Sequence, residues 1–223
     1  MFAATSFQAL LLHLREHVLP NLLDLLSPRR CPGCGLIGNG RFCGECGEPE
    51  PVPSDFEIEG VPVFVLGRYA GSLANAIRRL KYESKPELAG ALSELLALRL
   101  LRLQLVDAAW VPVPLHFERL VERGYNQSAL LARALAHRLG GKACPLVLRR
   151  ARYTQQQARL DRAAREHNLA DAFSVSRAPR SPLILVDDVL TTGSTVRAAI
   201  RALNDAGVSV RAVVALARAY TPR

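Results

Sequence analysis

Hydrophobic and polar positions divide the chain into short apolar runs and longer amphipathic stretches. The apolar runs, which are rich in valine, leucine and alanine, predict buried strands at residues 63–69, 108–115, 146–148, 183–186 and 208–217. The stretches between them have helix-forming composition and predict helices at residues 71–81, 87–105, 127–138 and 196–206. This alternation of strands and helices predicts an α/β fold with a parallel, doubly wound sheet.

Composition divides the chain into four parts. We predict an N-terminal helical arm at residues 1–27, a small cysteine-containing module at 28–50, a proline- and acid-rich linker at 51–62 and the main domain at 63–223. No apolar run approaches the roughly 20 residues of a membrane helix. The first residues also lack the basic start and the small-residue cleavage site of a signal peptide. We therefore expect a cytoplasmic protein without a transmembrane segment.

One stretch, residues 183–196, combines a strand with the chemistry of a binding site. Its sequence LILVDDVLTTGSTV places two carboxylates after the apolar run and a hydroxyl-rich turn before a helix. The turn and the helix N-terminus suit a phosphate, and the carboxylates suit ribose hydroxyls or a metal ion. The alternative is an ordinary strand–turn–helix with a capping hydroxyl. The candidate catalytic residues are Asp187 and Asp188, and the candidate phosphate ligands are Thr191, Thr192, Gly193, Ser194 and Thr195.

Four cysteines form two Cys-x-x-Cys pairs separated by eight residues. Two such turns can supply four thiolates to a tetrahedral zinc ion, and a segment this small needs a metal to fold. An iron–sulfur cluster and a pair of disulfides are the alternatives. The expected zinc ligands are Cys31, Cys34, Cys43 and Cys46, whereas Cys144 stands alone and is expected to be an inert buried thiol.

The net charge of +9 is distributed unevenly. Residues 1–60 carry a net charge of −4, and residues 61–223 carry +13, nearly all of it from arginine. Because the planar guanidinium group suits phosphate, this excess indicates an anionic partner, either a phosphorylated small molecule or a nucleic acid. The alternative is that the arginines decorate solvated helices.

Further candidate ligand-binding residues follow predicted elements. Each group has a plain structural alternative: a helix cap for Lys81 and Tyr82, and a solvated charged loop for residues 149–168. The functional interpretation places the loop after residue 115 at the same crevice as the carboxylates and makes residues 149–168 a flap over the ligand. The candidates are Lys81, Tyr82, Arg119, Arg123, Asn126, Arg152 and Arg165.

The stretch VDDVLTTGST resembles the phosphoribosyl-pyrophosphate (PRPP) motif of type I phosphoribosyltransferases. In that family, the acidic pair holds the ribose 2′ and 3′ hydroxyls and the TTGST loop holds the 5′-phosphate. The resemblance implies a type I phosphoribosyltransferase fold here. It also implies Mg²⁺, bound with PRPP between the pyrophosphate and the ribose diol.

The order of motifs is similar to that of the ComF family of competence proteins. Tandem Cys-x-x-Cys pairs are followed by LKY, VPVPLHxxRxxxRGYNQ, RxRxTxxQxxLxxxxREHNLxxAF and VDDVLTTGST, over about residues 28–218. This resemblance implies a structural zinc ribbon and a role in natural competence, at the import of single-stranded DNA through the inner membrane. Implied partners are single-stranded DNA, a competence helicase and other uptake proteins that would hold the protein at the inner face of the membrane. Some relatives are linked instead to carbon-source utilisation.

Three functions therefore stay open. The chain could transfer a glycosyl group from PRPP to an acceptor, bind PRPP or a nucleotide without catalysis, or act as a basic DNA-binding adaptor with an unused pocket. The sequence identifies neither a general base nor a hood that would recognise an acceptor base, since little more than Tyr220, Thr221 and Pro222 remains after the last predicted strand.

Overall fold

The computed structural model describes residues 28–52, 56–150, 172–176, 179 and 181–220. The predicted arm at 1–27 lies outside the described residues. The elements are β1 (Phe56–Ile58), β2 (Val61–Arg68), α3 (Gly71–Tyr82), α4 (Leu88–Arg102), β3 (Ala108–Pro112), α5 (Phe117–Arg123), α6 (Gln127–Leu139), β4 (Gly141–Ala143), β5 (Leu148–Arg150), β6 (Phe173–Val175), β7 (Leu183–Leu190), α8 (Ser194–Asp205) and β8 (Val210–Arg218).

A six-stranded sheet forms the centre of the molecule, in the order β1-β2-β8-β7-β3-β4. In this order across the sheet, each pair of neighbours between β2 and β4 is parallel. Only the edge strand β1 runs antiparallel to its neighbour, β2. The predicted parallel α/β sheet is thus confirmed. Because parallel strands end at the same edge, the residues that follow β3 and β7 meet at one side of the molecule.

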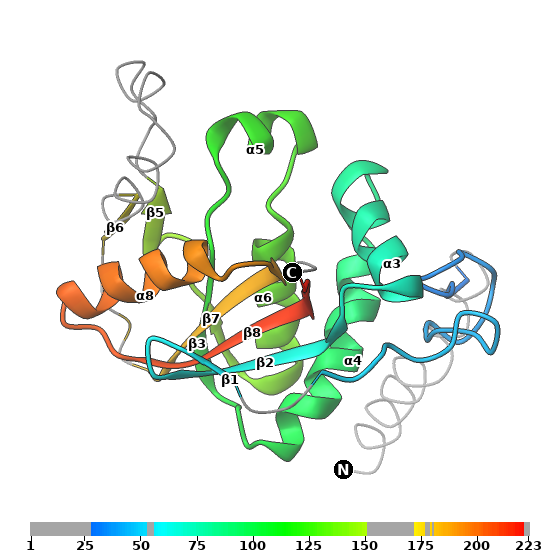
Figure 1. Ribbon diagram of the computed structural model, residues 1–223, viewed down its shortest axis with the longest axis horizontal. Coiled ribbons are helices and arrows are strands. Elements are labelled where there is room, and N and C mark those ends of the chain that lie inside the picture. The colour runs from blue at the N-terminus through cyan, green and yellow to red at the C-terminus, as the bar shows by residue number, and fades with distance from the viewer. Residues whose placement is uncertain (1–27, 53–55, 151–171, 177–178, 180, 221–223) are drawn as a thin grey trace, which may run out of the picture.

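Helices cover both faces of this sheet (Figure 1). On one face, α3, α4 and α6 pack against residues such as Ile184 and Val186, and on the other face α8 packs against Leu183 and Leu185. Successive residues of β7 therefore enter opposite hydrophobic clusters, which explains why its sequence is an unbroken apolar run. The small sheet of β5 and β6 joins the α8 side.

The central strand β7 is longer than its apolar run indicates. It continues through Asp187 and Asp188 to Leu190, because β8 runs beside it and pairs Asp187 with Ala215 and Val189 with Ala217. The expectation that the two carboxylates follow the strand was wrong, because both belong to the second half of the strand itself. Their side chains are fixed by the backbone of a buried strand rather than by a loop.

Several short elements have no counterpart among the predicted ones. Strand β1 lies within the stretch predicted to be a linker, helix α5 lies in the expected loop after β3, and β4 extends the sheet edge. Strand β5 begins at Leu148 rather than residue 146, because its antiparallel partner β6 sets its register. Within the part of the chain that the structure describes, no helix has both the length and the apolar character needed to cross a membrane.

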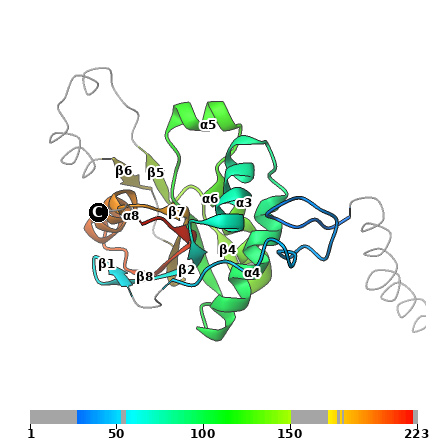
Figure 2. The same cartoon turned by 45° about the vertical axis from the view of Figure 1, so that its right-hand side comes forward.

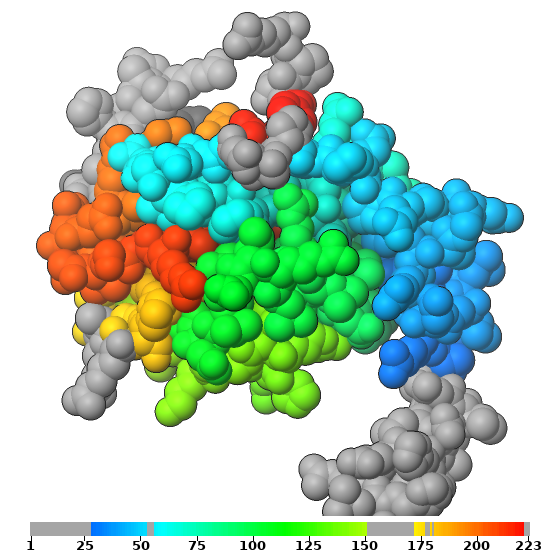
Figure 3. All heavy atoms as spheres, turned by 90° about the horizontal axis from the view of Figure 1, so that it is seen from below, coloured from blue at the N-terminus to red at the C-terminus, as the bar shows by residue number. Residues whose placement is uncertain are grey.

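The cysteine module forms a lobe at one end of the molecule, beside α3 and α4 (Figures 2 and 3). It is held together by backbone hydrogen bonds in its turns and by an isolated bridge between Arg30 and Ile37. Its Phe42 packs against the hydrophobic cluster under α3 and α4. The lobe is therefore seated on helices that also pack against one face of the sheet.

Candidate functional site

A pocket of about 980 Å³ opens at the carboxyl edge of the sheet. Six separate segments of the chain contribute to its walls: the ends of β2, α3, β3, β5, β7 and β8 or the residues that follow them. It is lined by Tyr69, Lys81, Val113, Pro114, Leu115, His116, Glu118, Arg119, Arg150, Asp187, Asp188, Val189, Thr191, Thr195 and Ala219. Six of the residues singled out from the sequence thus meet at one cavity.

Asp187 lies on the floor of this pocket and is held by two donors. The hydroxyl group of Ser128, on α6, donates to its Oδ1 at 3.1 Å, and the backbone N–H of Asp188 donates to the same oxygen at 2.9 Å. Burial and the neighbouring Asp188 carboxylate raise the pKa of Asp187 to about 7, although both hydrogen bonds and Lys81 oppose the shift. The carboxyl group is therefore partly protonated at neutral pH.

Asp188 is paired with a cation inside the protein. The Nζ atom of Lys81, at the end of α3, lies 2.7 Å from Asp188 Oδ1, and the two side chains are only 14% and 8% exposed. Lys81 is fixed in this position because its neighbour Leu80 is fully buried and the Tyr125 hydroxyl donates to the Leu80 carbonyl oxygen at 2.5 Å. The pair is therefore part of the pocket wall.

The hydroxyl-rich turn between β7 and α8 offers donor groups that could bind an anion. Gly193 has a φ of 74°, and a Cβ atom there would lie 2.9 Å from Ile58 Cδ1 of β1. Ser194 donates its backbone N–H to Thr192 Oγ1 at 3.3 Å, and the side chains of Thr191 and Thr195 line the pocket. No acidic residue occupies the first turn of α8. The positive end of this helix is therefore free of a competing carboxylate.

Two arginines line the same pocket as the carboxylates. Arg119 comes from α5 and Arg150 from β5, where its guanidinium group lies 5.6 Å from the ring centroid of Phe173. Burial and the proximity of Arg119 lower the pKa of Arg150, while Asp187 opposes the shift. Two neighbouring guanidinium groups repel each other when no anion lies between them, so this wall favours a bound phosphate.

Three other predicted residues lie beside the pocket rather than in its lining. The Arg123 guanidinium stacks 4.9 Å from the ring centroid of Tyr82 and donates to its hydroxyl oxygen at 3.2 Å. Asn126 caps α6 by accepting from the Ser128 N–H at 2.9 Å and donates to the Val113 carbonyl oxygen at 3.0 Å. Asn126 thereby fixes the position of Ser128 below Asp187. The predicted flap residues Arg152 and Arg165 lie outside the described residues.

Sequence reasoning missed Ser128 and Tyr69 and did not single out Arg150 among the arginines of its stretch. Ser128 follows a helix cap and resembles any first-turn serine, so only the packing of α6 against β7 identifies its contact with Asp187. Arg150 could have been distinguished by its place beside the apolar residues Val147 and Leu148, which are both buried. No local pattern indicates Tyr69.

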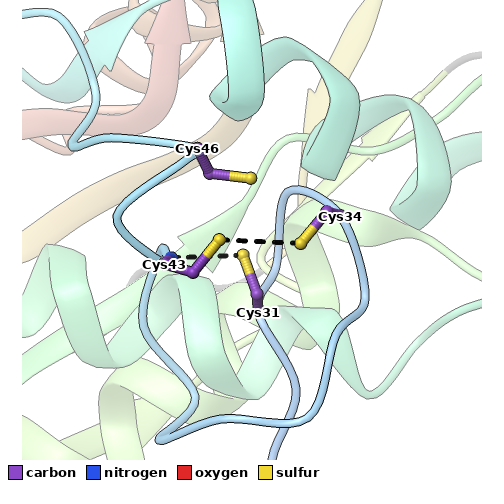
Figure 4. A group of neighbouring side chains, drawn as sticks. All are labelled: Cys31, Cys34, Cys43 and Cys46. Atoms are coloured by element: carbon purple, nitrogen blue, oxygen red, sulfur yellow. Dashed lines mark hydrogen bonds between the residues drawn. The ribbon is translucent and has the colours of Figure 1, made fainter.

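The four cysteines of the module converge on one point (Figure 4). Their sulfur atoms all lie within 4.8 Å of one another, and the Sγ atoms of Cys34 and Cys43 are 3.7 Å apart. A tetrahedral zinc ion with Zn–S bonds of about 2.3 Å places its sulfur ligands about 3.8 Å apart. The four side chains therefore fit zinc, and all four thiols are free in this structure.

Both Cys-x-x-Cys turns use the same backbone hydrogen bond. The carbonyl oxygen of the first cysteine accepts from a glycine four residues later, Gly35 in one turn and Gly47 in the other, each at 2.9 Å. Both glycines have positive φ angles, 82° and 64°, which residues with a Cβ atom rarely adopt. These turns direct each pair of sulfur atoms to the common centre.

Proximity makes the four thiols interdependent. Burial would raise the pKa of Cys31, but backbone N–H groups, including that of Cys43, donate to its sulfur and lower the pKa to about 6. Desolvation and the other three cysteines raise the pKa of Cys46 to about 12. Without a cation, one thiolate forms at the expense of the others, whereas a zinc ion stabilises all four.

Arg79 connects the cysteine module to α3. Its Nη1 atom donates to the Pro32 carbonyl oxygen at 3.0 Å, and its Nε atom lies 3.4 Å from Glu83 Oε2. Arg79 is two residues before Lys81 on the same helix. The module is therefore attached to the helix that carries the cation of the pocket.

Comparison with known proteins extends these observations. Residues 126–222 match the phosphoribosyl transferase domain, which contains β7, the TTGST turn and α8. The chain is 32% identical to Competence protein F from Haemophilus influenzae over 84% of its own length and 85% of the relative. It is also similar to the DNA utilization protein YhgH of Salmonella typhimurium, at 36% identity, and of Escherichia coli, at 35% identity, each over 74% of both chains.

Proposed function

Because this chain belongs to the ComF competence family of phosphoribosyltransferase-fold proteins, we propose that it binds PRPP or a related ribose 5-phosphate and acts in the handling of single-stranded DNA during natural competence. The competence role is supported by the names of the two kinds of relatives, Competence protein F and DNA utilization protein YhgH. The ligand is inferred from the pocket. We place this activity in the cytoplasm, at the inner face of the membrane, where a competence helicase and other uptake proteins would be its partners.

One observation carries the choice of ligand: the acidic pair and residues at the N-terminus of α8 line the same pocket. Carboxylates accept hydrogen bonds from a ribose diol but repel a phosphate, and the turn at Thr191–Thr195 donates to a phosphate. A ribose 5-phosphate has these two groups at its two ends. A terminal phosphate of DNA would satisfy only the turn, since deoxyribose lacks the 2′ hydroxyl.

The arginines define where a pyrophosphate group would lie. With ribose at Asp187 and Asp188, a pyrophosphate on the ribose C1 atom would be held by Arg119 and Arg150, the two arginines that line the same pocket. These guanidinium groups would bind the pyrophosphate and stabilise its charge if it departs. The same contacts serve a protein that only binds PRPP, so transfer to an acceptor is a separate step that pyrophosphate release would reveal.

Calorimetric titration of the purified protein with PRPP and Mg²⁺ tests this proposal. We expect saturable binding at one site per chain, and we expect the double substitution Asp187→Asn with Asp188→Asn to weaken it by about 10-fold or more, because each lost charged hydrogen bond is worth roughly 1.5–3 kcal/mol. The matched control is Asp205→Asn, at the exposed far end of α8. Absence of binding to the wild-type protein, or equal binding by the double variant, would refute the proposed ligand.

The same samples separate a binding protein from an enzyme. Pyrophosphate released in the presence of PRPP and candidate acceptors, and lost in the double variant, would indicate glycosyl transfer. Binding without release would support a sensor of PRPP. Both outcomes are compatible with the proposed ligand, and they assign different reactions to the same pocket.

A further inference from the structure

The acidic pair of the pocket already has a counter-cation. Lys81 Nζ lies 2.7 Å from Asp188 Oδ1, and this ion pair is almost fully enclosed, in contrast to the exposed lysines 85 and 142. Asp187 Oδ1 accepts from Ser128 and from the backbone of Asp188. One oxygen of each carboxylate is thus engaged by the protein itself.

These contacts do not fit a Mg²⁺ ion bound directly to the acidic pair. Mg²⁺ requires near-octahedral oxygen ligands at about 2.0–2.1 Å and keeps several waters. Such an ion on Asp188 would lie within a few ångströms of the Lys81 ammonium group, with little solvent between them to screen the repulsion. Either the lysine or the metal can neutralise this carboxylate at close range.

The other charged residues of the lining show how Lys81 changes the charge balance of the pocket. Arg119 and Arg150 are the other cations, and Glu118 is the other carboxylate, with its side chain 86% exposed and 3.5 Å from His116. With Lys81 in place, the pocket lining holds three basic side chains, one of them the exposed Arg119, against the two aspartates and the exposed Glu118. A phosphorylated ligand is therefore not repelled even when no metal ion accompanies it.

We propose that Lys81 acts as a built-in substitute for a divalent cation at the acidic pair, so that the pocket binds a ribose 5-phosphate without Mg²⁺. This inference rests on the proposed function and adds a property of the same site. Lys81 neutralises Asp188 and leaves the second oxygens of both carboxylates to accept from the sugar hydroxyls. It is a positioning residue, because its ammonium group acts through Asp188.

The anchoring of α3 supports this assignment. A lysine that merely capped the helix would be solvated, whereas Lys81 is kept in place by the buried Leu80 and by the Tyr125 hydroxyl on the Leu80 carbonyl oxygen. Because the ammonium group is already in position, the ligand does not have to order it on binding.

Titrations of the wild-type protein with PRPP, and separately with ribose 5-phosphate, in the presence of Mg²⁺ and in EDTA test the inference without any variant. We expect the dissociation constant of each ligand to differ by less than about threefold between Mg²⁺ and EDTA, which is well below a tenfold change in affinity. Binding in Mg²⁺ that disappears in EDTA would overturn the role of Lys81 while leaving the proposed function intact. Failure to bind under both conditions would instead overturn the proposed function.

Substitution of the lysine gives the second arm. Lys81→Met should weaken binding in EDTA by at least about tenfold, because it leaves Asp188 as an unpaired buried charge, and Mg²⁺ should recover part of this loss. Lys81→Arg should retain metal-independent binding, and Lys142→Met is the matched control on the distant β4. Tighter binding by Lys81→Met would show that the lysine competes with the ligand and would refute the inference. If Lys81→Met is unfolded by circular dichroism, Lys81→Arg carries the test, and binding by Lys81→Arg that is lost in EDTA but present in Mg²⁺ would overturn the inference.

Discussion

At the scale of single residues, the unusual group of this protein is the carboxyl of Asp187. Its pKa, about 7, is raised by burial and by Asp188 from the ordinary value of 3.8. In the folded protein the group therefore binds a proton at pH values where the unfolded chain has lost it. Stability contributed by this group is fully present below about pH 4 and is lost as the pH rises to about 7.

Replacing this carboxyl by an amide should remove that pH dependence. Asp187→Asn retains an oxygen that can accept from Ser128 and carries no charge at any pH. We expect its free energy of unfolding to equal that of the wild type near pH 4 and to exceed it by roughly 1–3 kcal/mol at pH 8. Urea denaturation at both pH values measures the difference.

The exposed Asp205→Asn serves as the control for this experiment and should show no difference that changes with pH. A variant of Asp187 that is less stable than the wild type at pH 8 would contradict the assignment of a raised pKa. It would show instead that the charged form is favoured in the folded protein.

The sequence predicts the site well where its residues are consecutive. Asp187, Asp188, Thr191 and Thr195 were identifiable because one strand and one turn carry them all into the pocket. The pairing of Lys81 with Asp188 and the contact from Ser128 were not identifiable, because they depend on how α3 and α6 pack against β7. Interactions between distant segments leave no local pattern.

At the scale of elements, length and burial decide which predictions succeed. The buried strands β2, β3, β7 and β8 were predicted because hydrophobic side chains are required along them. The elements that were missed have three to seven residues, and α5 contains no buried residue. Such short elements are specified by neighbouring segments: Ile58 of β1, for example, lies against Gly193.

The cysteine module is an element that a metal ion, rather than a hydrophobic core, should stabilise. We expect about one zinc ion per chain in the wild-type protein and a value well below one in Cys46→Ser, because structural zinc sites need all four ligands. The α/β domain has its own core and should stay folded, with a melting temperature lower by a few degrees, at roughly 2–4 °C for each kcal/mol lost. Elemental analysis and differential scanning calorimetry measure these quantities.

Cys144→Ser is the matched control for the zinc experiment, since this thiol lies outside the four-cysteine cluster and donates to the Lys142 carbonyl oxygen at 3.5 Å. It should leave the zinc content unchanged. Full zinc content in Cys46→Ser would argue against the four-cysteine site.

At the scale of the whole molecule, charge and exposed aromatic groups suggest how DNA would be held. Residues 61–223 carry the positive charge, and α5 begins with an exposed Phe117 and ends with Arg123, which stacks on Tyr82. Exposed aromatic rings next to arginines provide stacking surfaces for unpaired bases. This surface lies next to the pocket, because α5 also contributes Arg119 to its lining.

We therefore predict that single-stranded DNA binds with an affinity that falls steeply as salt increases. Phe117→Ala should weaken this binding by about tenfold, since stacking on one base contributes roughly 1–3 kcal/mol. Fluorescence anisotropy with a labelled oligonucleotide at several salt concentrations measures both effects. Leu101→Ala, on the exposed side of α4, is the control, and an equal effect of both substitutions would exclude a specific role for α5.

The order of strands was the least predictable property of the whole molecule. The apolar runs predict how many buried strands to expect, but they do not indicate that β8 is inserted between β2 and β7. That arrangement follows from which surfaces complement one another once the helices have packed. It is nevertheless what brings the carboxyl ends of β2 and β7 to one pocket.

The central position of β8 also has a consequence for how the protein is made. Translation produces β2 and β7 well before residues 210–218, and neither strand has its central partner until those residues leave the ribosome. At roughly 5–20 residues per second, the nascent chain spends seconds with two hydrophobic strand edges unpaired. The domain can thus complete its sheet only after synthesis of its last strand, and a nascent chain that stalls earlier is a substrate for chaperones rather than a smaller folded protein.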